Sequence, residues 1–310
     1  MSHVAGGEDW RRHARANRLQ SLLLVGVLVA IAGAAGWLLM GESGLWVALA
    51  ATGVALAIEP AAASRLTLRL YGARPLTGSP ALKQLVAQLS ARAGLPRPPR
   101  LYWVATPLAN AFAVGSRHDP HIAVTEGLLR NLGWRELAGV LAHEIAHIAQ
   151  DDLRVMGLAD YVSRLTALIA LVAQVSLLMA LPAWLAGALE IQWGGLLLLL
   201  FSPQLALLAQ LGLSRVREFD ADLLAVRLTG DPEGLAAALA KIERVSRSWK
   251  SWLMPGWGNP EPSWLRTHPA TEERIARLRA LQGGAALHQD WNWPGTPVDP
   301  PRWHPLGIWR

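Results

Sequence analysis

Long uncharged runs alternate with polar, charged segments along the chain. Residues 19–40 carry no charged side chain over 22 positions. As a helix this run reaches about 33 Å, enough to cross a hydrocarbon core. After a short turn at 41–44, a second apolar run at 45–64 contains Glu59 as its one charged residue. The pattern therefore predicts a helical hairpin that spans a membrane over 19–64.

Two further apolar runs, 165–189 and 191–214, contain no charged residue, and Arg215 follows them at once. Basic residues also flank the first hairpin, and Lys and Arg favour the cytoplasmic side of a membrane. Both hairpins are therefore predicted to begin and end in the cytoplasm. For 165–214 the alternative is an apolar hairpin packed in a soluble core. For 19–40 it is a cleaved secretory signal, although the run exceeds the usual ~7–15 residue core of such a signal.

Polar segments make up the rest of the chain. The amino-terminal segment, 1–18, is predicted to be cytoplasmic, as are all residues after 214. Asp231, Pro232 and Glu233 have the residue types expected at the start of a helix. A last helix is predicted over about 270–282. The loop at 249–264 and the tail at 283–310 are rich in Trp and Pro, residues that suit a membrane interface or a loose extension.

Composition supports a membrane protein. Of the 310 residues, 52% are hydrophobic and 17% are charged, which is too apolar for an ordinary soluble enzyme. The chain contains no cysteine, so a zinc site would have to use His, Asp and Glu. The net charge is +6, but the arginines lie beside apolar runs instead of forming a nucleic-acid motif. Membrane orientation explains the charge, and no nucleic-acid partner is expected.

The pentapeptide HEIAH at 143–147 is the clearest candidate for chemistry. On a helix, His143 and His147 stand one turn apart on the same face and can reach one metal ion. Glu144 is placed where a general base is needed. Such a pattern arises by chance in roughly one sequence of this kind in a hundred. The motif therefore needs a third ligand to support it.

Glu218 is the best candidate for that ligand. It lies in SRVREFDAD directly after the last apolar run, and Asp222 follows one helical turn later, where it could orient a ligand histidine. The alternative is a solvated helix face on which both acids pair with Arg215 and Arg217. The metzincin pattern is excluded, because Gln150 stands where that class requires glycine.

Four motifs in order resemble the HtpX-type membrane zinc metalloproteases, relatives of the CAAX prenyl proteases. They are the segment NAFAVGSRHDPHIAVTEGLL, HEIAH, SRVREFDAD and THPATEERIARL, and the resemblance covers about 100–280. It implies a mainly α integral membrane protein with a zincin-like α+β catalytic domain and a small β-sheet near the active-site helix. The second hairpin would divide that domain into 65–164 and 215–282.

The resemblance also implies roles for single residues. His143, His147 and Glu218 would bind one zinc ion per chain. Glu144 would be the catalytic base, and His268 would support the charge of the tetrahedral intermediate. Asp222 would accept a hydrogen bond from a ligand histidine and orient its ring. The substrate backbone is expected to pair with an edge strand at 110–114, whose substrate-binding residues would be Asn110, Ala111, Phe112 and Ala113.

The expected function is a zinc endopeptidase that cleaves membrane or misfolded proteins at the cytoplasmic face of the plasma (inner) membrane, in protein quality control. The alternatives are a CAAX-type prenyl protein endopeptidase, a non-catalytic zinc-binding membrane scaffold and a membrane-tethered zinc module that docks a partner. One departure from the family pattern is that Asp151 stands where relatives often have glycine. Asp152 then matches the family's aspartate and is expected to be structural.

Overall fold

The structure, a computed structural model, describes residues 5–57, 60–187, 193–250 and 271–281. The chain divides into two compact units. Within the described part, the hairpin unit comprises 5–57 and 155–217, and the sheet unit comprises 60–154, 218–250 and 271–281.

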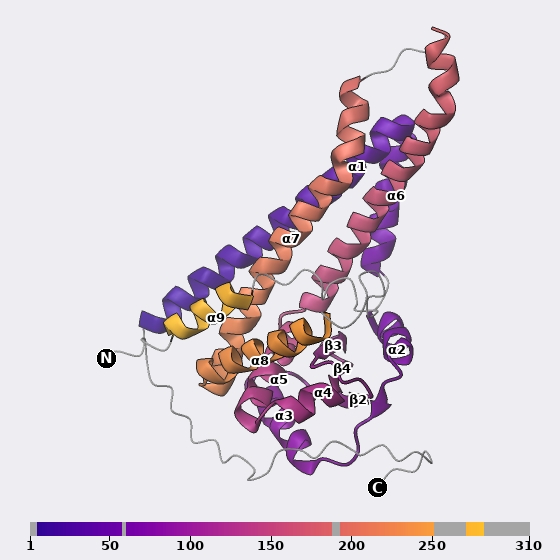
Figure 1. The fold of residues 1–310 in the computed structure, drawn as a ribbon. Helices are drawn as coiled ribbons and strands as arrows, with labels where there is room; N and C mark the ends of the chain where they lie inside the picture. The colour runs from indigo at the N-terminus through magenta and orange to yellow at the C-terminus, as the bar shows by residue number, and fades with distance from the viewer. Residues whose placement is uncertain (1–4, 58–59, 188–192, 251–270, 282–310) are drawn as a thin grey trace, which may run out of the picture. The chain divides into compact units, whose positions relative to one another are not determined.

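The hairpin unit begins with α1 (Ala5–Ala57), which is broken at Gly41. Gly41 has φ 64° and ψ −145°, a backbone conformation that glycine adopts without steric cost. The two legs of α1 fold back on each other from this point (Figure 1). Their backbones touch, because a Cβ at Gly36 would lie 2.4 Å from the carbonyl oxygen of Gly44. Glycine at both positions thus allows the close approach that the first hairpin needs.

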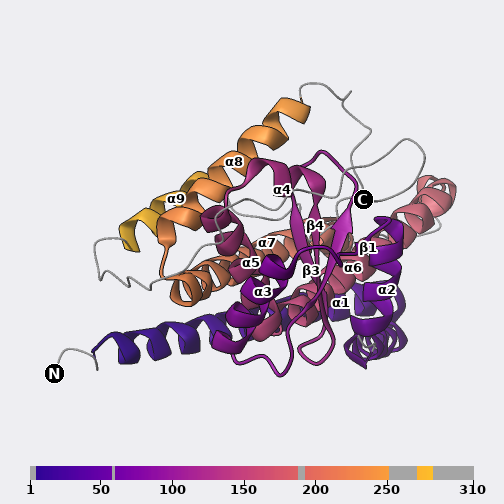
Figure 2. The same cartoon turned by 90° about the horizontal axis from the view of Figure 1, so that it is seen from below.

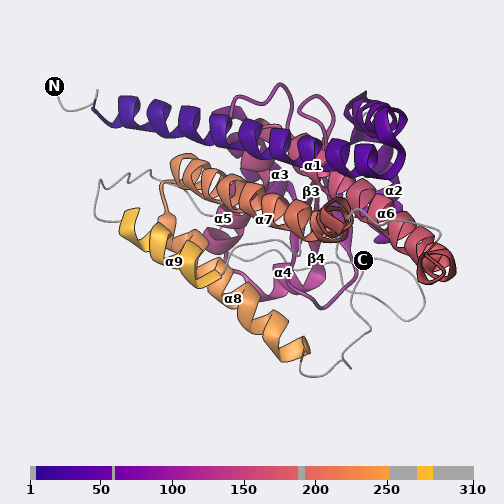
Figure 3. The ribbon, with the colours of Figure 1, turned by 90° about the horizontal axis from the view of Figure 1, so that it is seen from above.

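Helices α6 (Asp152–Leu185) and α7 (Trp193–Thr229) form the second hairpin. The Trp184 and Trp193 rings lie 5.9 Å apart at its turn end. The two helices run side by side with the long leg of α1 (Figures 1 and 3). Among the described helices, three are long and apolar enough to cross a membrane, namely α1, α6 and α7. Their shared core consists of Leu28, Ala32, Leu158, Ala159, Val162, Ala206, Ala209 and Leu213.

A four-stranded sheet organises the sheet unit (Figure 2). Its strands lie in the order β1-β2-β4-β3; β2 and β4 are parallel, and the other two pairs are antiparallel. Strand β3 therefore lies at an edge of the sheet. The strand bounds are Arg74–Pro75 for β1, Arg100–Val104 for β2, Ala111–Gly115 for β3 and Pro120–Thr125 for β4.

Helix α5 (Trp134–Ala149) is the central helix of this unit. It begins where the Gly133 N–H donates to the Glu136 carboxylate at 2.8 Å, which caps the first turn. Leu141, Ile145 and Ile148 are buried in a core that includes sheet residues. Burying each of these side chains stabilises the fold by roughly 1.5–3 kcal/mol.

Five further helices belong to the sheet unit. Helices α8 and α9 lie side by side (Figures 1 and 3). Asp231 caps α8 by accepting from the Gly234 N–H at 3.0 Å, as the sequence predicts. The helix bounds are Pro60–Leu70 for α2, Pro80–Arg92 for α3, Glu126–Asn131 for α4, Pro232–Lys250 for α8 and Thr271–Ala280 for α9.

The structure confirms the predicted fold class, a mainly helical chain with two apolar hairpins and a small sheet beside the HEIAH helix. The tail at 283–310 lies outside the described residues, as does nearly all of the loop at 249–264. The predicted domain boundaries stay predictions.

The contact between α5 and α8 generates a test of packing. A Cβ at Gly139 would lie 2.9 Å from the Cα of Leu235, so Gly139→Ala should overpack this contact and cost about 1–3 kcal/mol. The matched control is Gly157→Ala on α6, where a Cβ meets nothing within 4 Å and alanine should be neutral or stabilising by about 0.5–1 kcal/mol. Thermal unfolding in detergent, followed by tryptophan fluorescence, measures both. Equal midpoints would contradict the assigned contact.

Candidate metal centre

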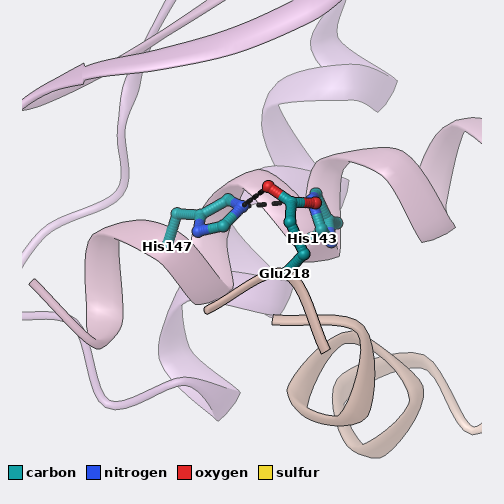
Figure 4. A group of neighbouring side chains, drawn as sticks. All are labelled: His143, His147 and Glu218. Atoms are coloured by element: carbon teal, nitrogen blue, oxygen red, sulfur yellow. Dashed lines mark hydrogen bonds and ion pairs between the residues drawn. The ribbon is translucent and has the colours of Figure 1, made fainter. Parts of the chain in front are cut away.

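Three side chains from two helices converge in the sheet unit. His143 and His147 lie one turn apart on α5, and Glu218 on α7 faces them (Figure 4). Their potential ligand atoms all lie within 4.8 Å of one another, and all three residues are buried. The two Nε2 atoms are 3.1 Å apart. The carboxylate of Glu218 lies 3.4 Å from Nε2 of His143 and 3.6 Å from Nε2 of His147.

A carboxylate contacts the Nδ1 atom of each histidine. Nδ1 of His147 lies 2.8 Å from Asp152, and Nδ1 of His143 lies 3.0 Å from Asp222. A carboxylate accepts the Nδ1 proton, which leaves the Nε2 lone pair of each ring directed at the space beside Glu218. Both contacts therefore favour the tautomer that a metal ligand requires.

Arg274 on α9 lies among these acids. Its guanidinium contacts Asp222 through two nitrogens, at 2.8 and 2.6 Å, and reaches Glu218 at 3.0 Å. Burial acts against this charge, but the Asp222 and Glu218 carboxylates outweigh burial and hold the pKa of Arg274 above its ordinary value. The guanidinium of Arg277, three residues later on α9, lies 3.6 Å from the centre of the Phe219 ring and gives a second contact between α9 and α7.

The buried charges favour a cation. Among the described residues near the site, five carboxylates are buried with two guanidinium groups, those of Arg217 and Arg274; the carboxylates are those of Glu144, Asp152, Glu218, Asp220 and Asp222. Such an excess of negative charge is costly in a low-dielectric interior unless a cation offsets it. The donor set of two imidazole nitrogens and one carboxylate suits a divalent transition metal. The residues present therefore fit a metal ion.

His143 shows how strongly its surroundings favour positive charge. Burial and the nearby Arg274 charge both act against protonation of this ring. Its hydrogen bonds to Asp222 and Glu218 outweigh them and raise the pKa of His143 to about 10. A metal ion needs the neutral ring, so metal binding in the neutral pH range would release this proton.

The turn between α5 and α6 explains the departure from the family pattern. Asp151 has φ 57°, in the left-handed region that glycine favours and that Asp tolerates better than most residues. The next residue, Asp152, is fully buried and contacts His147. The left-handed residue thus turns the chain so that Asp152 reaches the site.

The structure brings together most of the residues that the sequence singles out. Glu144 is buried on α5 next to His143, and Asp222 contacts His143 as the spacing suggests. The substrate-binding segment begins with half-buried Asn110 and continues into edge strand β3, where Ala111, Phe112 and Ala113 are buried. His268 lies outside the described residues. The proposed roles of all these residues stay predictions.

Two residues of the site escape sequence reasoning. Asp152 was expected to be structural, and the spacing did not predict that its carboxylate lies 2.8 Å from Nδ1 of His147. Arg274 belongs to the motif THPATEERIARL, yet that segment contains four arginines or acids and no spacing rule selects one of them. A buried arginine is recognised only when its partners on another helix are known.

The fold and the site define a membrane protein with a buried metal-ligating group between α5 and α7. A model of peptidase family M48 matches residues 78–282, about two thirds of the chain. The chain is 39% identical to a protein named Protease HtpX homolog from Acaryochloris marina, over 86% of this chain and 95% of that relative. It is 32% identical to Protease HtpX from Legionella pneumophila, over 86% of this chain and 99% of that one.

The chain belongs to peptidase family M48, with HtpX proteins among its relatives. It is a multi-pass membrane protease, and its substrates are polypeptides. Among solved structures, S. mikatae Ste24p is similar with a TM-score of 0.46 and 18% identity, over 86% of this chain and 66% of that one.

Asp152 and Asp151 form a matched pair for testing the carboxylate behind His147. Asp152→Asn removes the charge that accepts from His147 Nδ1 and should lower metal affinity about 10- to 100-fold. Asp151→Asn should leave affinity unchanged, because Asp151 is exposed and Asn tolerates its left-handed backbone. Competition of zinc between each variant and a chelator measures the affinities. Equal affinities for Asp152→Asn and wild type would show that the Asp152 carboxylate does not support metal binding.

Proposed function

We propose that this protein is a zinc-dependent endopeptidase that cleaves membrane or misfolded proteins. The observation that carries the proposal is the convergence of two histidine Nε2 atoms on Glu218, with each ring held by a carboxylate at Nδ1. A site with two histidines and one glutamate is a common zinc donor set in hydrolases. The absence of cysteine from the chain agrees with that choice.

When bound, zinc would lower the pKa of a water and polarise the peptide carbonyl. His143, His147 and Glu218 would hold the ion. Glu144 would accept the proton of the attacking water and pass it to the leaving amine. Its position supports this role, because it directly follows a ligand histidine on α5 and its buried carboxylate lies in the field of Arg274. Whether His268 assists with the oxyanion stays a prediction.

The edge strand β3 would bind the substrate backbone. Strand β3 pairs with β4 on one side, and its other side ends the sheet, so a peptide could add as a further strand. Hydrogen bonds to a backbone do not depend on side chains, which would make cleavage tolerant of sequence. All residues of β3 are buried, so this pairing requires the edge to be uncovered first.

The hairpins support an orientation in the membrane. Trp37 and Trp46 lie near the turn of the first hairpin, and Trp184 and Trp193 lie at the turn end of the second. Tryptophan favours the membrane interface, and basic residues flank the other ends of both hairpins. This pattern supports an active site on the cytoplasmic side of the inner membrane. A task in protein quality control there is part of the proposal and follows from the resemblance to HtpX proteases.

Two other functions remain candidates. Prenyl protein cleavage is a related chemistry, but the relatives with the matches above are named HtpX proteases. A non-catalytic scaffold predicts damage to a catalytic position, whereas His143, Glu144, His147 and Glu218 are all present and buried.

Glu144→Gln separates chemistry from metal binding. The variant should retain the zinc content of the wild type, since Glu144 is not a ligand, and should lose proteolysis by a factor of about 10² or more, since it removes the proton acceptor. Glu126→Gln is the matched control, because Glu126 pairs with Arg130 on α4 away from the metal ligands. Cleavage of an unfolded protein in detergent and metal analysis provide the two readouts. Equal cleavage by Glu144→Gln and wild type, or no zinc in either, would overturn the proposal.

The orientation has its own test, because a chain without cysteine accepts single cysteines cleanly. Ser43→Cys lies in the turn of the first hairpin and should react with a membrane-impermeant maleimide added to intact spheroplasts. Gln88→Cys, exposed on α3, should react only after lysis. The reverse labelling pattern would place the sheet unit on the outer side of the membrane.

A further inference from the structure

Helix α2 (Pro60–Leu70) is the segment that follows the first hairpin in the chain. Helix α1 ends at Ala57, so the chain leaves only three peptide steps before α2 begins. Three residues span at most about 10 Å. The start of α2 is therefore held close to the end of the second leg, whatever the arrangement of the two units.

The length of that leg places the start of α2 at the membrane surface. From Glu42 to Ala57 the leg reaches about 24 Å, somewhat less than the ~30 Å hydrocarbon core. Residues 58–63 carry Glu59 as their one charge, and Arg65 follows. On the first leg, Arg18 ends the basic segment that precedes the apolar run. The bilayer boundary on this side therefore falls near the first turn of α2.

The inner face of α2 packs against the sheet unit. Ser64 and Leu68, one turn apart, are buried. Tyr71, directly after the helix, places its ring 4.9 Å from the ring of Phe112 in β3. Phe112 points away from the core that surrounds α5, because its neighbours Ala111 and Ala113 belong to that core and strand side chains alternate. Helix α2 thus supports the back of the edge strand.

The outer face of α2 consists of two stripes. Leu66 and Leu70 are one turn apart and are 60% and 73% exposed. Arg65 and Arg69 are also one turn apart and exposed, and they lie beside the leucines. In a domain surrounded by water, two such exposed leucines would cost free energy. A helix that lies in a membrane interface has this arrangement, with leucines toward the acyl chains and arginines toward the headgroups.

We propose that α2 lies in the plane of the bilayer interface, with Leu66 and Leu70 inserted between the lipids and Arg65 and Arg69 on anionic headgroups. Three observations favour lipid over a protein partner: the short chain link to a membrane-spanning hairpin, the apolar leucine stripe and the basic stripe that matches anionic lipid. Since Tyr71 contacts Phe112, the helix holds β3 at a constant depth below the membrane surface. If β3 binds substrate as proposed above, cleavage is confined to segments that emerge from the bilayer within reach of this strand.

The test uses the full chain in lipid vesicles with single cysteines carrying a bimane fluorophore. Leu66→Cys and Leu70→Cys report the leucine stripe, Arg69→Cys reports the basic stripe, and Gln88→Cys on α3 is the exposed control. Quenching by lipids with nitroxide on the acyl chain is compared with quenching by aqueous iodide. Labels at 66 and 70 should be quenched by the lipid and protected from iodide, and the label at 88 should behave in the opposite way. The label at 69 should show quenching by both reagents that is intermediate between these two results.

A second arm tests the charges. Vesicles of phosphatidylcholine are compared with vesicles that also contain anionic phosphatidylglycerol. Lipid quenching of the Leu70→Cys label should increase with the anionic lipid, and Arg65→Gln with Arg69→Gln should remove the increase, since each arginine contributes about a fivefold bias toward an anionic surface. An increase that survives the double substitution would overturn the role of the arginines.

Two results would overturn the proposal that α2 lies in the bilayer interface. Labels at 66 and 70 that iodide reaches as easily as the label at 88 would show a helix in water. Labels protected from both quenchers would show a protein contact, either a partner or a second copy. Retained zinc content and elution as a single species on size exclusion confirm that each variant is folded. The quenching measurement does not depend on proteolysis. Failure of the proposed membrane position of α2 and failure of the proposed endopeptidase function are therefore distinguishable.

Discussion

The hydrogen bond from each site histidine to a carboxylate is the contact on which the rest of the site depends. Without Asp152 and Asp222, the rings of His147 and His143 could rotate or adopt the other tautomer, and their Nε2 atoms would no longer converge. These acids add negative charge to an interior that already contains Glu144 and Glu218. The buried Arg274 offsets part of that charge, and a bound cation would offset more of it, so orientation and charge balance are two parts of one arrangement.

Helix continuity connects this site to the membrane segments. Asp152 is the first residue of α6, and Glu218 lies on α7, so both helices of the second hairpin also supply residues to the candidate metal centre. Successive residues on a helix turn by about 100°. A shift of α7 by one residue would therefore direct Glu218 away from the histidines. The position of Glu218 therefore depends on the register of α7, the helix that also supplies one leg of the apolar hairpin.

Patterns of local spacing allowed much of the fold to be predicted. Uncharged runs predicted both hairpins, Asp231 and Pro232 predicted the start of α8, and HEIAH predicted the face of α5 that carries both histidines. Each of these predictions depends on neighbours within a few turns of one helix. Glu218 and Asp222 were found by their spacing after an apolar run together with resemblance to a known family. The predicted segment at 45–64 was divided between α1 and α2, because hydropathy does not distinguish a spanning leg from the apolar first turn of the next helix.

Composition and periodicity were sufficient to predict the class of this protein, which is an apolar, cysteine-free chain with two hairpins and a histidine pair on a helix. The tertiary structure decided which charges meet. Arg274 is 52 residues from Asp222 and 131 from His143, and only the packing of α9 on α7 brings its guanidinium to both. Asp152 likewise reaches His147 because Asp151 adopts a left-handed backbone. Local pattern specifies faces of helices, whereas contacts between distant charges depend on how those faces pack, which is a property of the whole fold.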